Sequence, residues 1–396
     1  MTTEARPYPF PETAQLELAP EYGRYRRAAG LGRLEMPYGG VAWLATRLAD
    51  VKLVLSDPRF SRAAAVGADA PRTMPMMETT PSILNLDPPE HTRVRRVVAR
   101  AFTVRRVELL RPRIQQVVDG LLDRMIDRGP EADLVTDFSL PLAVTAISEL
   151  LGVPEDQRSE FHEWSHRATA IKDVSIEDIM AAQQSLAAFF SELAAKRREQ
   201  PTEDLIGLLV SARDVEERLS DEELVQLGIA LLAAGHETTA NQLSGYVFTL
   251  LTQPGLWQRL LADPGLVPRA VEELARITPL GVVTFGRIAR EDLEVGGTLV
   301  RAGESVVCQI AAANRDESVF EGAEAVDFDR EANPHISFGH GLHHCLGAPL
   351  ARVELQTGLA SVLRRLPGLR LATPAAQVPF KANHLLRGPR SLPVTW

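Results

Sequence analysis

The sequence of 396 residues is 45% hydrophobic and 24% charged, which is typical of a folded globular protein and excludes a disordered, collagen-like or disulfide-scaffold chain. The formal net charge of −9 excludes a chain-wide basic surface for nucleic acid or for an anionic membrane. With only Cys308 and Cys345, the chain is not a disulfide framework and suits a reducing compartment. The first residues hold no apolar run of signal-peptide or membrane-anchor length. We therefore expect an unanchored cytoplasmic protein.

Helical patterns dominate the chain, and strand patterns are few and short. No linker, repeat or low-complexity segment interrupts them, so the simplest expectation is one domain over residues 1–396. In chain order, the patterns predict a strand at 41–44, helices at 89–128, 140–151, 176–198, 220–254 and 268–277, a hairpin at 293–300 with its turn at Gly296-Gly297, a strand at 305–310 and a helix at 348–366.

The most clearly marked element is the helix that begins after Ser220. Ser220 and Glu223 have the spacing of a capping box, and Pro254 forbids continuation of the helix. Apolar residues recur at three- and four-residue steps, so the helix is expected to be on the order of 50 Å long and largely buried. Its middle, residues 234–239, instead reads Ala-Gly-His-Glu-Thr-Thr. Polar side chains and a glycine at positions where apolar side chains would pack better indicate a functional site.

A second unusual tract, residues 338–347, reads Phe-Gly-His-Gly-Leu-His-His-Cys-Leu-Gly and precedes the last helical pattern. A cysteine just before a helix meets the positive end of the helix dipole and free backbone N–H groups, which favour the thiolate. The thiolate of Cys345 is therefore a candidate nucleophile or metal ligand. A buried free cysteine in a tight turn is the plainer alternative.

Zinc and cysteine-protease chemistry are further alternatives for this tract. The histidines at 340, 343 and 344 are zinc-ligand types, but no second ligand pair follows. His236-Glu237 is not part of an H-E-x-x-H motif, because residue 240 is alanine. A cysteine protease needs a base held by a third group, which no sequence rule identifies here. Neither alternative has a complete motif.

Three sets of charged residues have helical spacing. Glu273 and Arg276, and likewise His91 and Arg95, share a helix face and are most simply solvated surface groups. Residues 93–113 hold eight arginines and one acid, a local charge of +7 within a chain of net −9. Such a segment is a candidate docking surface for an acidic partner.

Taken together, these tracts resemble the bacterial, soluble class of the cytochrome P450 family over nearly the whole chain. Four of the 43 basic residues are lysine and the other 39 are arginine, as GC-rich genomes favour, so an actinobacterial type is expected. The motifs occur in the family's order, and the cysteine signature is among the more specific short motifs that one sequence can show. The matching residues are 234–239 for A-G-x-E-T-T, Glu273 and Arg276 for E-x-x-R, and Phe338, Gly341, Cys345 and Gly347 for F-x-x-G-x-x-x-C-x-G.

The resemblance implies the mainly helical P450 fold with small β-sheets, and haem b (iron protoporphyrin IX) as cofactor. Cys345 would be the axial thiolate on the haem iron, a strong electron donor that favours O–O cleavage. Glu237 and Thr238 match the acid–alcohol pair that delivers protons to bound dioxygen. Glu273 and Arg276 would be structural and not catalytic. The other residues assigned to haem binding are His91, Arg95, Arg287 and His343 at the propionates, together with Ala234, Phe338, Gly339 and Gly347.

The implied reaction is insertion of one atom of dioxygen into a lipophilic small molecule, by hydroxylation or epoxidation, in natural-product and specifically antibiotic biosynthesis. Oxidation of a xenobiotic, terpene or fatty acid is the alternative within the family, and a haem-binding sensor without turnover is the alternative outside it. Because no flavin or iron–sulfur signature is present, electrons would come from a separate ferredoxin or flavodoxin and its NAD(P)H reductase. By family analogy, the mostly apolar substrate pocket is lined by Met76, Met77, Leu231, Gly235, Leu280, Val282 and Val283.

Overall fold

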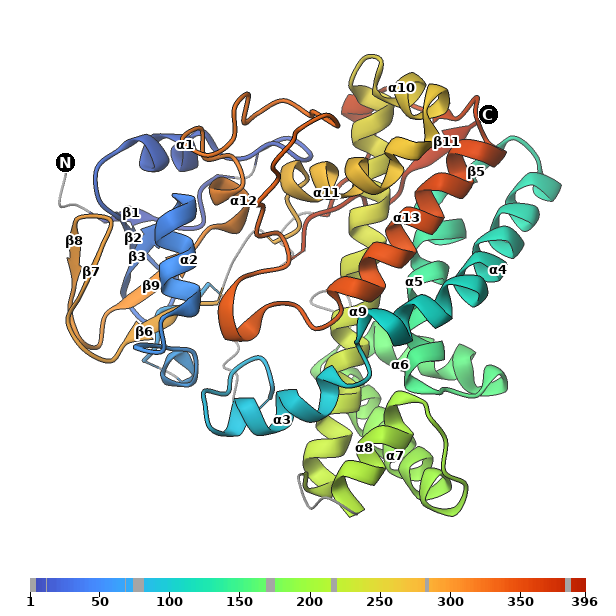
Figure 1. Ribbon diagram of the computed structural model, residues 1–396, viewed down its shortest axis with the longest axis horizontal. Helices are drawn as coiled ribbons and strands as arrows, with labels where there is room; N and C mark the ends of the chain where they lie inside the picture. Colours follow the sequence, from blue (N-terminus) through green and yellow to red (C-terminus); the bar gives the residue numbers. More distant parts are fainter. Residues whose placement is uncertain are drawn as a thin grey trace. The chain divides into compact units, whose positions relative to one another are not determined.

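The computed structural model describes residues 5–11, 13–67, 69–73, 82–168, 175–214, 219–281, 285–381 and 386–396. The chain divides into two compact units (Figure 1). Neither unit is a continuous stretch of chain, so the division does not separate an N-terminal from a C-terminal domain, and the single domain expected over 1–396 stays a prediction. Unit 1 comprises Met1–Asp87, Gly265–Cys345 and Pro379–Pro389, and unit 2 comprises Pro88–Pro264, Leu346–Val378 and Arg390–Trp396.

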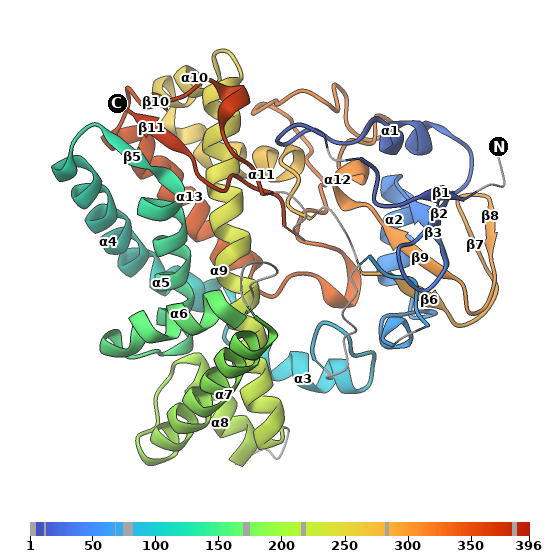
Figure 2. The ribbon, with the colours of Figure 1, turned by 180° about the vertical axis from the view of Figure 1, so that it is seen from behind.

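Unit 1 is built on one mixed sheet. Its elements are β1 (Arg6–Pro7), α1 (Pro20–Arg27), β2 (Gly32–Glu35), β3 (Val41–Ala45), α2 (Leu48–Ser56), β4 (Phe60–Ser61), α11 (Val267–Ile277), β6 (Arg287–Ala289), β7 (Leu293–Val295), β8 (Thr298–Val300), β9 (Ser305–Cys308) and α12 (Ile310–Ala313). The six strands of the sheet have the order β1-β2-β3-β9-β6-β4. β3 and β9 pair in parallel, with buried Leu44 opposite buried Val307. β1, β2, β3 and β9 therefore lie side by side, although β9 is distant in the sequence (Figures 1 and 2).

The hairpin expected at 293–300 is confirmed. β7 and β8 pair in antiparallel fashion, and the turn residues Gly296 and Gly297 have φ values of +56° and +81°, which side chains other than glycine rarely allow. The strand expected at 305–310 is shorter, because β9 ends at Cys308. Gln309 then caps α12 by accepting a hydrogen bond from the Ala311 N–H.

Unit 2 is mainly helical. Its elements are α3 (Glu90–Ala99), α4 (Val104–Arg128), β5 (Glu131–Asp133), α5 (Leu140–Leu151), α6 (Arg158–Ala168), α7 (Ile176–Glu199), α8 (Leu205–Asp214), α9 (Asp221–Thr252), α10 (Leu256–Ala262), α13 (Ala348–Arg365), β10 (Arg370–Leu371) and β11 (Pro393–Thr395). α9 packs against α5 and α13, and α13 lies alongside α4 (Figure 1). A small sheet in the order β10-β11-β5 joins the end of the chain to the segment after α4. Its strands of two or three residues are too short to leave a sequence pattern.

α9 confirms the helix expected after Ser220. The capping box is complete, because Ser220 Oγ accepts from the Glu223 N–H at 3.0 Å and Glu223 Oε2 accepts from the Ser220 N–H at 2.8 Å. Glu223 also forms an ion pair with Arg93 of α3, and the hydrogen bonds from that guanidinium hold the pKa of the Glu223 carboxyl below its ordinary value. The Glu223 carboxylate thus caps the N-terminus of α9 and also links α9 to α3 through Arg93.

The other helical patterns are confirmed with one correction. α5, α7, α11 and α13 match the expected ranges to within one residue at either end. The pattern at 89–128 forms two helices instead of one, because α3 ends at Ala99 and Thr103 caps α4 by accepting from the Arg106 N–H. Across the part of the chain that the structure describes, no helix combines the length and apolarity that a membrane span requires.

Candidate active site

Cys345 lies in unit 1 on a loop that backbone hydrogen bonds hold in shape. The Cys345 N–H donates to the Phe338 carbonyl at 2.8 Å, and the Gly339 N–H donates to the Ile336 carbonyl at 2.8 Å. The Cys345 side chain is exposed, so the alternative of a buried structural cysteine is wrong for this residue. It describes Cys308 instead, where burial raises the pKa of the thiol to about 12.

Two glycines shape the cysteine loop, residues 338–345, which the hydrogen bond from Cys345 to Phe338 closes. Gly339 and Gly341 have φ values of +78° and +70°, in the left-handed region that favours glycine. A Cβ on Gly341 would also lie 2.3 Å from the Leu55 carbonyl oxygen of α2. Gly341 therefore lets the turn Gly341–His343 approach the end of α2 more closely than any side chain would permit.

Arg287 places a buried cation in the same unit. It lies on β6 with 6% of its surface exposed, and burial lowers the pKa of its guanidinium. No carboxylate among the described residues forms an ion pair with Arg287. A buried guanidinium without an acid can bind the carboxylate of another molecule. His343, the second predicted propionate partner in this unit, is half-buried.

His91 and Arg95 belong to α3 in unit 2. They lie one turn apart on one helix face. His91 is 1% exposed and Arg95 is half-buried. The simplest interpretation of the sequence, a solvated surface histidine at position 91, is therefore wrong.

The middle of α9, also in unit 2, departs from ordinary helix packing. A Cβ on Gly235 would lie 2.8 Å from the Ile147 side chain of α5, so glycine permits close approach of the two helices. The Thr238 hydroxyl donates to the Ala234 carbonyl at 2.6 Å, a bond within the helix that satisfies the hydroxyl without a second element. Glu237 and Thr238 are half-buried and Ala234 is exposed, so this stretch is less buried than the part of α9 that follows it, residues 239–250.

The donor set in these residues fits haem b. An exposed thiol on a fixed loop can bind iron, and the buried Arg287 guanidinium suits a propionate. In unit 1 the predicted haem residues are Phe338, Gly339, His343, Cys345 and Arg287, and in unit 2 they are His91, Arg95, Ala234 and Gly347. Gly347 is the residue before the first turn of α13.

Glu273 and Arg276 form the predicted pair, and it is buried instead of solvated. Arg276 Nε and Nη2 donate to the two Glu273 carboxylate oxygens at 2.8 and 2.7 Å. The same guanidinium donates to the carbonyls of Asn314, Ala323 and Ala325. The pair thus joins α11 to the segments after α12, which agrees with a structural role.

The predicted substrate-pocket residues are only partly described. Leu231 is buried, and Gly235 and Leu280 are half-buried. Five residues after Leu280, exposed Phe285 packs under the Arg62 guanidinium, whose Cζ lies 4.5 Å from the Phe285 ring centroid. Met76, Met77, Val282 and Val283 lie outside the described residues.

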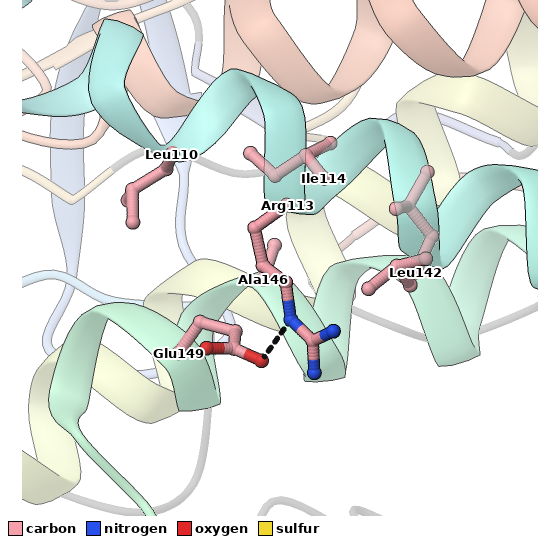
Figure 3. Close-up of a pocket in the computed structure, with 7 residues that line it drawn as sticks. Leu110, Arg113, Ile114, Leu142, Ala146 and Glu149 are labelled. Atoms are coloured by element: carbon pink, nitrogen blue, oxygen red, sulfur yellow. Dashed lines mark hydrogen bonds and ion pairs between the residues drawn. The ribbon is translucent and has the colours of Figure 1, made fainter.

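A shallow groove between α4 and α5 is separate from these residues (Figure 3). Arg113 Nε donates to Glu149 across the groove at 3.0 Å. The groove is lined by Leu110, Arg113, Ile114, Val117, Leu142, Ala146 and Glu149.

The sequence did not single out Glu272 and His335, whose side chains form a hydrogen bond at 3.0 Å although they lie 63 residues apart in the chain. His335 precedes the cysteine tract by three residues, but no local pattern points to its partner. For the zinc alternative, the described residues include no group of three His, Cys, Asp or Glu side chains that could hold a metal ion.

A family model described as Cytochrome P450 matches residues 144–381 of the chain. The chain is 50% identical to nocardicin C N-oxygenase of Nocardia uniformis subsp. tsuyamanensis, with 100% of this chain and 99% of that protein covered. It is 46% identical to mycinamicin IV hydroxylase/epoxidase of Micromonospora griseorubida, with 100% of both covered. The solved structure of the LnmA cytochrome P450 hydroxylase from the leinamycin biosynthetic pathway of Streptomyces atroolivaceus has a TM-score of 0.94 and 46% identity, with 99% of this chain and 100% of that chain covered.

Proposed function

The chain belongs to the cytochrome P450 family and is a haem-b monooxygenase, and we propose that it oxygenates a lipophilic small molecule of antibiotic biosynthesis. The identity of 46–50% along the whole chain to enzymes named for nocardicin C and mycinamicin IV carries this proposal. A sensor without turnover is set aside, because these relatives are named as oxygenating enzymes. Oxidation of a xenobiotic, terpene or fatty acid is the competing outcome of a substrate screen.

Cys345 would hold the haem iron, supported by its exposed thiol on a loop fixed to Phe338. Phe338, Gly339 and Gly347 would shape the surroundings of the thiolate. Arg287 and His343 of unit 1, with His91 and Arg95 of unit 2, would bind the propionates, since two carboxylates need cationic and hydrogen-bonding partners. The exposed side chain of Ala234 leaves a small surface on α9 for the ring.

When bound, the haem supplies activation of dioxygen with two electrons. The protein residues would handle the two protons. Thr238 gives its hydroxyl hydrogen to the Ala234 carbonyl, so its oxygen lone pairs can accept a hydrogen bond from a water molecule. Glu237 is half-buried and adjacent in the chain, and it would be the acid of the pair. This arrangement supports proton delivery by the pair.

Oxygenation of nitrogen is a second candidate reaction. The relative at 50% identity is named an N-oxygenase, whereas the one at 46% is named a hydroxylase/epoxidase. The described pocket residues are apolar and place no charged group that would select one kind of atom. C–H hydroxylation and epoxidation therefore remain the first proposal for carbon-rich substrates, and N-oxygenation applies to substrates with an accessible nitrogen.

A separate ferredoxin or flavodoxin with its NAD(P)H reductase would deliver the electrons, and residues 93–113 are the proposed docking surface. The arginines at 93, 111 and 113 form ion pairs with Glu223, Glu108 and Glu149. Arg96, Arg100 and Arg105 are exposed. Val104 and Leu109 are 67% and 75% exposed. Basic side chains around exposed apolar ones are suited to an acidic protein partner.

A cytoplasmic location is part of this proposal, because cytosolic reductases would supply the electrons.

The first test is an absorption spectrum of the purified protein, ferric and then reduced under carbon monoxide. We expect a strongly red-shifted Soret band in the wild type and loss of that band in Cys345→Ala. Cys308→Ala is the matched control and is expected to keep the band. A protein that stays haem-free when expressed with ample haem would contradict the proposal.

The second test is turnover of a panel of macrolide, β-lactam, terpene and fatty-acid substrates with a surrogate ferredoxin and reductase. Mass spectrometry and NMR of the products distinguish a hydroxyl, an epoxide and an oxygenated nitrogen. Oxygenation confined to terpenes or fatty acids would replace the proposed substrate class by the competing one.

A further inference from the structure

His335 is held between an acid of α11 and the backbone that leads to the cysteine loop. Its side chain is 4% exposed, and its Nε2 lies 3.0 Å from Glu272 Oε2. Its Nδ1 accepts a hydrogen bond from the Ser337 N–H at 3.2 Å. A backbone N–H can only donate, so Nδ1 carries a lone pair and Nε2 carries the hydrogen that is donated to Glu272. The two contacts together define one tautomer and one ring orientation.

The segment after His335 is fixed at several points. Asn314 Oδ1 accepts from the Ile336 N–H at 2.8 Å, and Asn314 Nδ2 donates to Ser337 Oγ at 2.8 Å. Ser337 Oγ donates in turn to the Ala275 carbonyl of α11 at 2.6 Å. All these residues belong to unit 1. The Ser337 N–H donates to His335 Nδ1. The histidine therefore satisfies the backbone N–H of Ser337, which the contacts of Asn314 and Ala275 do not reach.

A chain of backbone bonds continues from this segment to the cysteine. The Gly339 N–H donates to the Ile336 carbonyl, and the Cys345 N–H donates to the Phe338 carbonyl, both at 2.8 Å. The His335 and Phe338 rings lie 6.2 Å apart. The path from Glu272 through His335, Ser337 and Phe338 to Cys345 thus consists of hydrogen bonds of 2.8 to 3.2 Å and covalent links. The neighbouring acid Glu273 is engaged by Arg276 and Arg330, which distinguishes its role from that of Glu272.

We propose that Glu272 and His335 are positioning residues for the Cys345 thiolate. By fixing the Ser337 backbone, the pair sets the path of Phe338 and the hydrogen bond that the Cys345 N–H makes, and thereby the electron donation of the sulfur to the iron. Hydrogen bonding around a ligand is one of the means by which proteins tune haem iron. This inference rests on the proposed function, in which Cys345 binds the haem iron.

Three variants of the haem-loaded protein test the proposal. Glu272→Gln removes the carboxylate charge, His335→Asn retains an acceptor in place of Nδ1 but loses the reach to Glu272, and the double variant combines them. The readouts are the ferric–ferrous reduction potential and the position of the ferrous–CO Soret band. We expect each single variant to shift the ferric–ferrous equilibrium about threefold to tenfold, as for one lost charge-assisted hydrogen bond. The double variant should shift it no further than the larger single change.

The control is Glu331→Gln, which removes the same charge from an exposed nearby residue and is expected to leave both readouts unchanged. Glu272 is 29% exposed at its side chain, so Glu272→Gln is expected to fold even if His335→Asn does not. Wild-type potential and spectrum in Glu272→Gln would overturn the inference. A wild-type protein without the red-shifted band would instead overturn the proposed function, so the two failures are distinguishable.

Discussion

Thr238 makes one described hydrogen bond, from its hydroxyl to the Ala234 carbonyl one turn earlier. Thr238→Ala removes the hydroxyl but leaves the helix bond pattern intact, so haem binding and NAD(P)H consumption should persist. Product formation is expected to fall by about 100-fold, the lower range for loss of a proton-transfer group. Hydrogen peroxide should account for the consumed NAD(P)H, which a peroxide assay beside product quantification measures.

The matched control is Thr252→Ala, which removes an equivalent hydroxyl-to-carbonyl bond at the end of the same helix. It should retain the wild-type ratio of product to NAD(P)H. Fully coupled product formation in Thr238→Ala would exclude the proposed proton-delivery role.

Glu354 of α13 is a buried acid whose Oε2 has no hydrogen-bond partner in the described structure. Burial raises the pKa of its carboxyl well above the ordinary 4.5. The folded state therefore keeps this proton at pH values where the unfolded state has lost it. The free energy of unfolding should fall by up to about 1.4 kcal/mol per pH unit above the unfolded pKa, until the folded carboxyl also ionises.

Glu354→Gln removes this pH-dependent loss. The variant should gain stability over the wild type at pH 8 relative to pH 5, as measured by urea unfolding at both pH values. Glu294→Gln, at an exposed position, should show no such pH-dependent difference. If the free energies of unfolding of Glu354→Gln and wild type differed by the same amount at pH 5 and at pH 8, Glu354 would not titrate in this way.

At the scale of elements, the close approach of α9 to α5 depends on Gly235. Gly235→Ala should gain up to about 1 kcal/mol of helix propensity but lose about 1–3 kcal/mol by overpacking against Ile147, so a net destabilisation is expected. Gly120→Ala on α4 is the control, because its Cβ would meet only the Arg124 guanidinium at 3.7 Å. That variant should be neutral or stabilising by up to about 1 kcal/mol.

Ile147→Ala removes both side-chain carbons, Cγ1 and Cδ1, that the new Cβ would meet at 2.8 Å. In the double variant with Gly235→Ala, the combined loss in urea unfolding should be smaller than the sum of the single losses. Additive losses would mean that the two side chains do not compete for the same space.

At the scale of the whole molecule, the net charge of −9 makes the exposed arginines of residues 93–113 a local exception. Replacing Arg96 and Arg100 together by glutamate should raise the apparent KM for a ferredoxin, and the effect should shrink at high salt. Replacing exposed Arg24 and Arg301 by glutamate changes the net charge equally and should leave that KM unchanged. Salt-insensitive, unaltered turnover in the first variant would remove the docking proposal.

The helices were predictable because their determinants are local. The capping box at Ser220, the stop at Pro254 and the apolar periodicity between them set α9 without help from the rest of the chain. The break between α3 and α4 was missed, since the apolar spacing continues through it and only the cap at Thr103 marks the boundary. The site residues Cys345 and Thr238 were also predicted from the sequence, because the chemistry restricts their type and spacing, and their roles stay proposals.

Sequence alone therefore determined the helical class, the family resemblance and the candidate iron ligand, which depend on short-range spacing. Tertiary structure decided which groups are buried and what they contact. The Glu273–Arg276 pair is buried although its spacing resembles that of a surface pair, and Glu272 meets His335 across 63 residues. β3 pairs with β9, although Ala42 and its partner Ser305 lie 263 residues apart in the chain. Such pairings are selected because the folded molecule buries apolar surface and satisfies its polar groups. Both effects depend on residues far apart in the chain, so no short segment of sequence encodes them.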